Sequence, residues 1–172
     1  MQGVLVFITG LSGSGKTTLA YALQEYLQKE YHKKSIVLDG DELRACVENF
    51  EYTKNSRLKM AKYYIKLSQI LYKQNFIVIL STISMFDEIR DYNRQNFARY
   101  LEIFLDVSLD IRKQRDSKNF FKQKITNIAG VDQTLEFPKT SDIVLKDNFQ
   151  IQTNVKTIAN IIDKLSIKEN NE

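Results

Sequence analysis

Runs of apolar residues recur along the chain at the length of buried β-strands. Five runs have this character, at residues 4–9, 35–39, 76–83, 100–107 and 142–147. Stretches with helical spacing separate most of these runs, and strands that alternate with helices form parallel sheets with helices on both faces. The pattern therefore predicts an α/β fold of three layers with a mostly parallel, five-stranded sheet.

Two of the intervening stretches carry the apolar stripe of an amphipathic helix. The first, at residues 16–31, repeats leucine every fourth residue from position 19. The second, at residues 55–74, repeats apolar side chains at steps of three and four from Met60 onward, and Arg57 precedes that stripe. Side chains at this spacing lie on one face of a helix, so we expect both helices to pack on the sheet.

Directly behind the first apolar run the chain reads GLSGSGKTT, at residues 10–18. A glycine-rich loop between a strand and a helix exposes backbone N–H groups that can cradle phosphate, and the helix start adds positive potential. In this pattern the lysine reaches the β- and γ-phosphates and the next hydroxyl ligates Mg²⁺. The sequence therefore predicts a nucleoside triphosphate site with Mg²⁺ on Thr17. Its binding residues are Gly10, Leu11, Ser12, Gly13, Ser14, Gly15, Lys16, Thr17 and Thr18.

The second apolar run continues into LDGDELR, at residues 38–44. Open parallel sheets bind ligands at the carboxyl ends of their strands, so Asp39 and Asp41 are expected beside the phosphate loop. One carboxylate can hold Mg²⁺ through water, while the other accepts a proton from an attacking hydroxyl. The structural alternative is an Asx turn in which Asp41 caps the following helix. Beside a phosphate loop the pair favours catalysis by Lys16, Asp39 and Asp41, and which carboxylate acts as the base stays open.

The composition narrows the class of protein. The chain has 172 residues, 43% of them hydrophobic, and a formal net charge of +4. This length suits one α/β domain, so a single domain over residues 1–172 is expected. The first strand begins almost at once and no apolar run reaches membrane-spanning length, which predicts a cytoplasmic protein with no membrane partner. One cysteine and one histidine exclude metal sites built on these residue types.

Cations concentrate at residues 112–124, which read RKQRDSKNFFKQK. Such a run suits a nucleic-acid surface, a lid that grips phosphate, or a solvated helix end. The periodic pattern fades between about residues 116 and 138, and a loop of that length in a compact domain is usually functional. We therefore predict a lid over about residues 116–138, with Arg115 and Lys118 closing over the phosphates and no nucleic-acid partner.

Six segments of the chain follow the order and approximate spacing of adenylylsulfate kinases. They are FITGLSGSGKTTLA, LDGDELR, FIVILSTIS, RDSK, GVD and FPKTSDIVL, and they span residues 4 to about 147. The chain resembles that family, whose members pass the γ-phosphoryl group of ATP to the 3′-hydroxyl of a nucleotide with an anhydride at its 5′ end. The resemblance implies a P-loop NTPase fold, ATP as co-substrate, Asp41 as the base, and a homodimer. The acceptor-binding residues that it implies are Asp39, Arg44, Tyr52, Arg57, Met60, Ile83, Ser84, Lys118 and Ile128.

The chain departs from that family where the acceptor is expected to bind. Counting from the flanking motifs, Tyr52 and Ile128 replace two phenylalanines that enclose adenine in adenylylsulfate kinases. A base stacked on an aromatic ring gains about 1–3 kcal/mol, so losing one ring should weaken purine binding. Met60 replaces an asparagine, and Asp87 stands where a cation is expected. Each change also has a packing or capping explanation, but together they indicate a smaller base and a less anionic 5′ group.

Two segments resemble a particular branch of the family. STISMFDEIRDYNRQN and YLEIFLDVSLDIRKQRDSK are similar to kinase-like proteins of bacterial surface-polysaccharide gene clusters. That branch includes a kinase for cytidine diphosphoramidate, on the pathway that adds O-methyl phosphoramidate to capsule sugars. The resemblance implies this acceptor, because cytosine is smaller than adenine and a phosphoramidate carries less negative charge. The alternatives are adenylylsulfate as the acceptor and, more remotely, a nucleotide-switched binding protein, although the NKxD segment of small GTPases does not occur.

Overall fold

The strands form one fully parallel sheet. The computed structural model describes residues 2–115 and 135–167. The spatial order is β2-β3-β1-β4-β5, and every pairing is parallel. The α/β prediction with a five-stranded parallel sheet is confirmed, and each strand end lies within one residue of its predicted position. The strands are β1 (Val4–Gly10), β2 (Ser35–Asp39), β3 (Ile77–Thr82), β4 (Tyr100–Asp106) and β5 (Ile143–Lys146).

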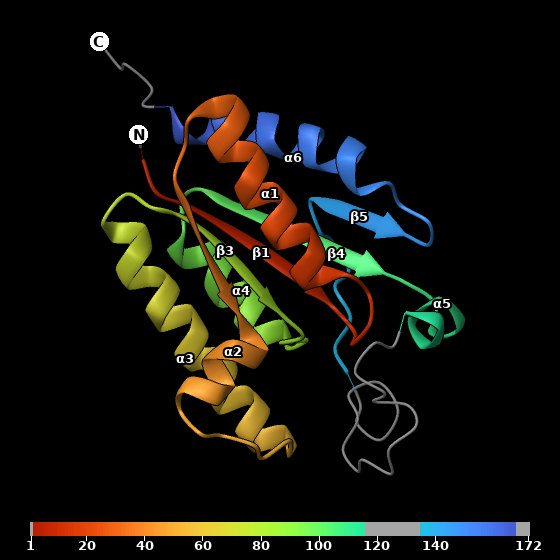
Figure 1. The fold of residues 1–172 in the computed structure, drawn as a ribbon. Coiled ribbons are helices and arrows are strands. Elements are labelled where there is room, and N and C mark those ends of the chain that lie inside the picture. Colours follow the sequence, from red (N-terminus) through yellow and green to blue (C-terminus); the bar gives the residue numbers. More distant parts are fainter. Residues whose placement is uncertain (1, 116–134, 168–172) are drawn as a thin grey trace.

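Helices connect the strands and cover the sheet (Figure 1). The two predicted amphipathic helices are present as α1 and α3, with α3 shifted by one residue. The Thr53 hydroxyl accepts a hydrogen bond from the backbone N–H of Ser56 at 3.3 Å, and this cap begins α3. In the described residues the helices are α1 (Lys16–Tyr31), α2 (Gly40–Cys46), α3 (Lys54–Lys73), α4 (Asp87–Asn96), α5 (Leu109–Gln114) and α6 (Ile151–Ser166).

Alternating side chains along β1 contribute to two separate cores. Val4, Val6 and Ile8 point to one face, which α1 and α6 cover. Leu5 and Phe7 point to the other, which α3 and α4 cover. Figure 1 shows the two helix layers on opposite sides of the sheet. Successive side chains of a strand point to opposite faces, so a central strand covered on both sides is apolar throughout.

The connections place three loops together at the carboxyl ends of the strands. α1 follows β1 and lies on one face, whereas α4 follows β3 and lies on the other. Since β1 and β3 are neighbours, the loops at their carboxyl ends diverge, and open α/β sheets bind ligands at such a point. The candidate site is therefore expected where β1, β2 and β3 end.

Some predictions concern residues outside the described part. The predicted lid over residues 116–138 falls mostly there, and only its end at residues 135–138 is described. Lys118 and Ile128 also lie outside it. Among the helices of residues 2–115 and 135–167, none is long and apolar enough to cross a membrane.

Candidate active site

The loop between β1 and α1 has the backbone shape of a phosphate cradle. Gly13 and Gly15 have φ angles of 78° and 99°, in the left-handed region that glycine enters without steric cost. A Cβ added at Gly10 would lie 2.9 Å from the Leu105 carbonyl oxygen, and one added at Gly13 would lie 2.9 Å from that of Arg112. Both contacts are too short for a side chain. At these two glycines the loop backbone therefore packs directly against β4 and α5.

Polar side chains in this loop suit a bound triphosphate. The Lys16 ammonium donates a hydrogen bond to the Leu11 carbonyl oxygen at 3.1 Å, so its charge lies over the loop. Ser14 is fully buried, and within the described residues its hydroxyl has no hydrogen-bond partner. Leaving such a group unsatisfied costs about 1–3 kcal/mol. A phosphate oxygen in the cradle is a partner of the right kind, and the residues present fit a nucleoside triphosphate.

Arg112 of α5 supports the loop from outside. Its Nε donates to the Val107 carbonyl oxygen at 3.1 Å, and one terminal nitrogen donates to the Ser12 carbonyl oxygen at 3.4 Å. The side chain is buried, and this burial lowers the pKa of its guanidinium. The basic run contains no signal that singles out Arg112, because charge spacing does not reveal which arginine turns inward. Arg115, predicted to bind ATP, lies 5.9 Å from the ring centre of Phe149.

Asp39 joins the phosphate loop to the start of α2. One of its carboxylate oxygens accepts hydrogen bonds from the hydroxyls of Thr17 at 2.8 Å and Ser81 at 3.3 Å. The other oxygen accepts from the backbone N–H groups of Asp41 at 2.9 Å and Glu42 at 3.4 Å. The carboxylate that caps α2 is thus Asp39, and the alternative with Asp41 as the cap is wrong.

Thr17 and Asp39 together fit Mg²⁺. This ion prefers oxygen ligands and is usually held by one or two carboxylates, substrate phosphates and water. The hydroxyl and carboxylate oxygens lie 2.8 Å apart beside the phosphate cradle and are ligands of this type. Within residues 2–115 and 135–167, no group of three or more His, Cys, Asp or Glu residues could hold a metal. A site on these two residues would therefore depend on the bound phosphates.

Asp41 stands in the first turn of α2, with its side chain exposed. Tyr64 of α3 fixes this turn, because its hydroxyl donates to the Gly40 carbonyl oxygen at 2.9 Å. Burial raises the pKa of Tyr64 to about 12, so the hydroxyl keeps the proton that it donates. A Cβ at Gly40 would also lie 2.9 Å from the Thr82 hydroxyl. The carboxylate of Asp41 therefore projects from a firmly held helix start.

Two arginines meet at the ring of Tyr52. The guanidinium carbons of Arg44 and Arg57 lie 4.9 Å and 5.2 Å from the ring centre. Arg44 is buried and donates to the Asn49 side chain at 2.9 Å and the Glu51 carbonyl oxygen at 3.0 Å, while Arg57 donates to the Tyr52 carbonyl oxygen at 3.0 Å. Burial, and secondly the charge of Arg44, lower the pKa of Arg57. Two like charges held this close create a positive surface that suits an anion.

The other predicted acceptor residues have different surroundings. Met60 is buried in the core on the α3 side of the sheet, which is the packing explanation of this position. Ile83 packs on the cluster that contains Leu11 of the phosphate loop. Ser84 is buried at a φ of 27°, and its hydroxyl lies 3.0 Å from that of Thr82. Contact of these three residues with an acceptor stays a prediction.

Asp87, at the position where a cation was expected, is the first residue of α4. Its carboxylate forms an ion pair with Arg90, one turn along the same helix. The cap of α4 is Phe86, so the capping explanation of Asp87 is wrong. The negative charge of Asp87 is instead balanced by its own helix.

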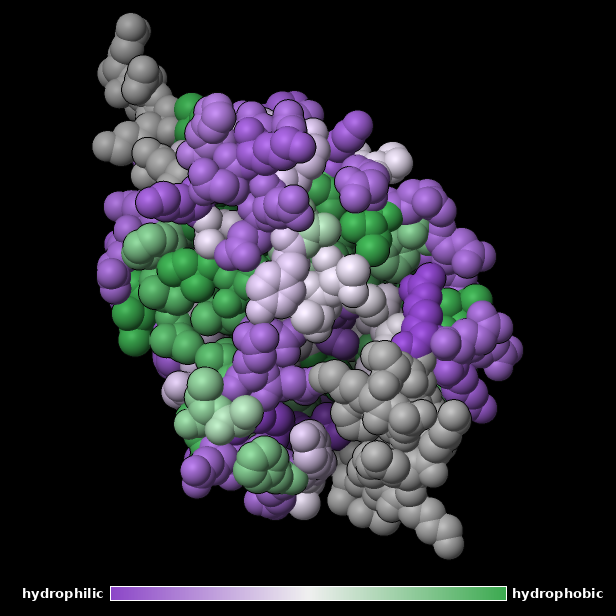
Figure 2. Space-filling model, in the orientation of Figure 1, coloured by the Kyte–Doolittle hydropathy of each residue, from purple (hydrophilic) through white to green (hydrophobic). Residues whose placement is uncertain are grey.

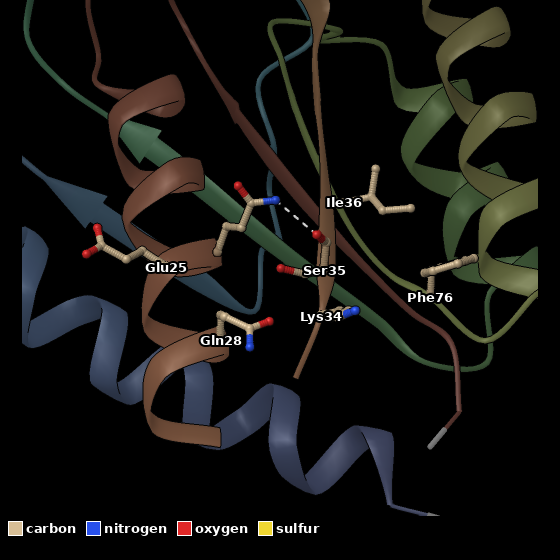
Figure 3. A pocket seen from close by; sticks show the side chains of 7 residues that line it. Glu25, Gln28, Lys34, Ser35, Ile36 and Phe76 are labelled. Carbon is tan, nitrogen blue, oxygen red and sulfur yellow. Dashed lines mark hydrogen bonds between the residues drawn. The ribbon is translucent and has the colours of Figure 1, made fainter. Parts of the chain in front are cut away.

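A hollow lies beside the start of β2, at the opposite end of that strand from Asp39 (Figure 3). It has a volume of about 500 Å³, and the Gln24 side chain donates to the Ser35 carbonyl oxygen at 2.9 Å in its wall. An apolar area covers the neighbouring surface, on the left of Figure 2, where α3 and β2 lie in Figure 1. Ile70 of α3 is 57% exposed. The hollow is lined by Gln24, Glu25, Gln28, Lys34, Ser35, Ile36 and Phe76.

Comparisons with known proteins agree with this geometry. The sequence model of a family described as adenylylsulphate kinase matches residues 2–146. A Campylobacter jejuni protein named cytidine diphosphoramidate kinase is 38% identical, over 95% of this chain and 96% of its own. A Pyrococcus abyssi protein named probable adenylyl-sulfate kinase is 32% identical, over 83% of this chain and 84% of its own.

Solved structures give the same result. The Mycobacterium tuberculosis APS kinase in complex with AMPPNP and APS has a TM-score of 0.86 and 26% identity, with 94% of this chain and 98% of that one covered. The resemblance drawn from the motifs is thereby confirmed, as is the prediction of a kinase. The chain belongs to the adenylylsulfate kinase family of ATP-dependent P-loop kinases.

Proposed function

We propose that this kinase transfers the γ-phosphoryl group of ATP to the 3′-hydroxyl of cytidine diphosphoramidate. The observation that carries the proposal is the 38% identity to the relative named for that acceptor, which extends over 95% of this chain. The surroundings of Asp87 point the same way. At position 87 the chain carries a carboxylate paired with Arg90 in place of the expected cation, and this does not suit a strongly anionic 5′ group. The second candidate acceptor is adenylylsulfate, which the family match over residues 2–146 favours.

In this proposal the loop at residues 10–17 holds the triphosphate of ATP. Lys16 leaves the Leu11 carbonyl oxygen and reaches the phosphates, and Ser14 gains a partner for its hydroxyl. Thr17 and Asp39 would hold Mg²⁺, which would supply positive charge to neutralise the phosphates. Arg115 and Lys118 add further positive charge. Phosphoryl transfer gains most of its acceleration from such positioning and electrostatic stabilisation.

Asp41 is the general base in this proposal. Its carboxylate takes the proton of the 3′-hydroxyl as that oxygen bonds to the γ-phosphorus, while the bond to the bridging oxygen breaks and ADP leaves. Asp41 suits this role because its side chain is exposed, whereas Asp39 is buried. Arg44 and Arg57 bind the 5′ group of the acceptor, and Tyr52, whose ring both arginines contact, binds its nucleobase.

The biological setting belongs to the same proposal. The product enters the pathway that adds O-methyl phosphoramidate to capsule sugars, in the cytoplasm. The kinase acts as a homodimer, and the apolar area over α3 and β2 offers a surface for a second copy (Figure 2). Sedimentation of the purified chain tests the dimer, because a monomer has a mass of 20.1 kDa.

The acceptor is tested by ADP release from ATP with Mg²⁺. Cytidine diphosphoramidate and adenosine 5′-phosphosulfate are supplied separately at matched concentrations. We expect kcat/KM to favour the cytidine compound by about 5- to 150-fold, since a mismatched stacking contact costs about 1–3 kcal/mol. Lys16→Ala is the control and should lose turnover with both acceptors. Preference for the adenosine compound would identify an adenylylsulfate kinase and overturn the proposed acceptor.

A further inference from the structure

Residues 135–137 pack beside the carboxyl ends of β1, β3 and β4. Leu135 packs on the cluster formed by Leu11, Met85 and Phe104, to which Ile83 also belongs. The ring centre of Phe137 lies 6.2 Å from that of Phe104. Leu11 comes from the phosphate loop and Ile83 from the loop after β3. This short segment therefore packs on a cluster to which both loops contribute.

Glu136, in the middle of this segment, is held by three hydrogen bonds to the start of α4. Its backbone N–H donates to the Met85 carbonyl oxygen at 3.3 Å. Its carbonyl oxygen accepts from the Arg90 guanidinium at 2.7 Å, and its carboxylate accepts from the backbone N–H of Asp87 at 2.6 Å. Both the main chain and the side chain of Glu136 thus bind one helix end.

The carboxylate of Glu136 replaces a missing helix cap. The N-cap residue of α4 is Phe86, whose side chain makes no capping hydrogen bond. The first N–H groups of a helix need an acceptor and favour negative charge, and Glu136 supplies both from outside the helix. Arg90, only 5% exposed, depends on the same arrangement because its partners are Asp87 and Glu136.

Glu136 also lies near the start of α3. Its second carboxylate oxygen lies 4.0 Å from the Lys54 ammonium, at the first residue of α3. Arg57 is in the first turn of that helix and contacts Tyr52. The loop with Ile83 and Ser84 directly precedes α4. The Glu136 carboxylate therefore lies near the start of α3, which carries Arg57, and at the start of α4, which follows the loop with Ile83 and Ser84.

We propose that Glu136 is a positioning residue for the acceptor, which acts by holding the start of α4 and the Ile83–Ser84 loop in place. The inference rests on the proposed function, because it presumes that those elements bind the acceptor. Glu136 touches no reacting atom in this role. Its loss should weaken acceptor binding and leave the binding of ATP in the phosphate loop almost unchanged.

The test compares three variants of the full chain. Glu136→Ala removes the cap, Glu136→Gln keeps an oxygen that can accept from Asp87, and Glu88→Gln is the matched control. Glu88 also lies in the first turn of α4, and it pairs with Lys62 at 3.2 Å, with both side chains more than half exposed. The variants are assayed for kcat and for the KM of each substrate, with whichever acceptor the wild type uses.

We expect Glu136→Ala to raise the KM for the acceptor about tenfold and the KM for ATP less than about twofold. Glu136→Gln should lie between Glu136→Ala and the wild type, and Glu88→Gln should match the wild type. Equal increases in both KM values, or the same change in Glu88→Gln, would overturn the inference.

Hydrogen exchange of the substrate-free chains separates this inference from the proposed function. The amides in the first turn of α4 should exchange faster in Glu136→Ala than in the wild type or in Glu88→Gln. Unchanged exchange would overturn the positioning role even if both acceptors react. If exchange is faster in Glu136→Ala and the wild type uses neither acceptor, the role of Glu136 at α4 is supported and the proposed acceptor is contradicted.

Discussion

Asp39 and Asp41 are two positions apart, yet the fold gives them different environments. Asp39 is 7% exposed, and its two oxygens accept hydrogen bonds from Thr17 at the start of α1 and from the first turn of α2. Asp41 is exposed at a helix start that Tyr64 holds in place. A carboxylate with satisfied oxygens is suited to hold structure and metal, whereas an accessible one can receive a proton.

Replacing Asp41 by asparagine tests the role of this residue as the base. We expect Asp41→Asn to lower kcat roughly 10²–10⁴-fold, the usual contribution of general-base catalysis, with the affinity for ATP unchanged. Single-turnover kinetics and ATP titration measure the two quantities. Unchanged turnover would remove Asp41 from the mechanism.

Asp39→Asn provides the matched comparison at the neighbouring carboxylate. It should lower the stability of the protein as well as its activity, because Asp39 uses one oxygen to cap α2 and the other to accept from Thr17, and an amide has only one oxygen. Urea unfolding of the two variants measures this difference. An equal loss of stability in both would contradict the division of roles between the two residues.

At the scale of elements, the phosphate loop is shaped by its packing against β4 and α5. Gly10 faces the main chain of β4, and Gly13 faces the main chain of α5. The positive φ of Gly13 adds a backbone requirement to the steric one. The glycines of the motif thus serve two purposes, bare amides for phosphate and close packing of the loop on its neighbours.

Gly10→Ala tests whether this packing matters for ATP binding. Gly3→Ala, which also crowds a backbone carbonyl but lies outside the loop, is the control for lost stability. The new Cβ would lie 2.9 Å from the Leu105 carbonyl oxygen at Gly10 and 2.2 Å from that of Tyr72 at Gly3. Both variants should lose about 1–3 kcal/mol of stability from overpacking. Only Gly10→Ala should also raise the KM for ATP, because Gly3 is outside the loop. A normal KM in Gly10→Ala would show that the loop tolerates displacement.

At the scale of the whole molecule, ligand binding and folding are coupled. A ligand that binds only the folded chain at a hundred times its Kd stabilises it by about 2.7 kcal/mol, which raises the Tm of a chain of this size by roughly 5–10 °C. We expect this shift with ATP and Mg²⁺, and almost none in Lys16→Ala. A larger shift with GTP than with ATP would favour the nucleotide-switched alternative. Thermal unfolding with each nucleotide measures it.

The sequence by itself determined the five strands, the helices α1 and α3, and the phosphate loop. Strands buried on both faces are continuous apolar runs, so all five could be located to within a residue. The spacing of GLSGSGKTT carries its own geometry, because the loop, its lysine and its hydroxyl are neighbours in the chain. The order of the motifs was enough to identify the family.

Only the tertiary structure decided which side chains meet across the fold. Arg112 contacts Ser12 although 100 residues separate them, and Glu136 caps a helix start 49 residues earlier in the chain. Neither contact leaves a periodic trace, because one residue in an irregular segment is enough to make it. The cap at Asp39 rather than Asp41 also depended on the direction in which the backbone leaves β2. Spacing reveals local geometry, whereas these contacts arise from how distant segments pack.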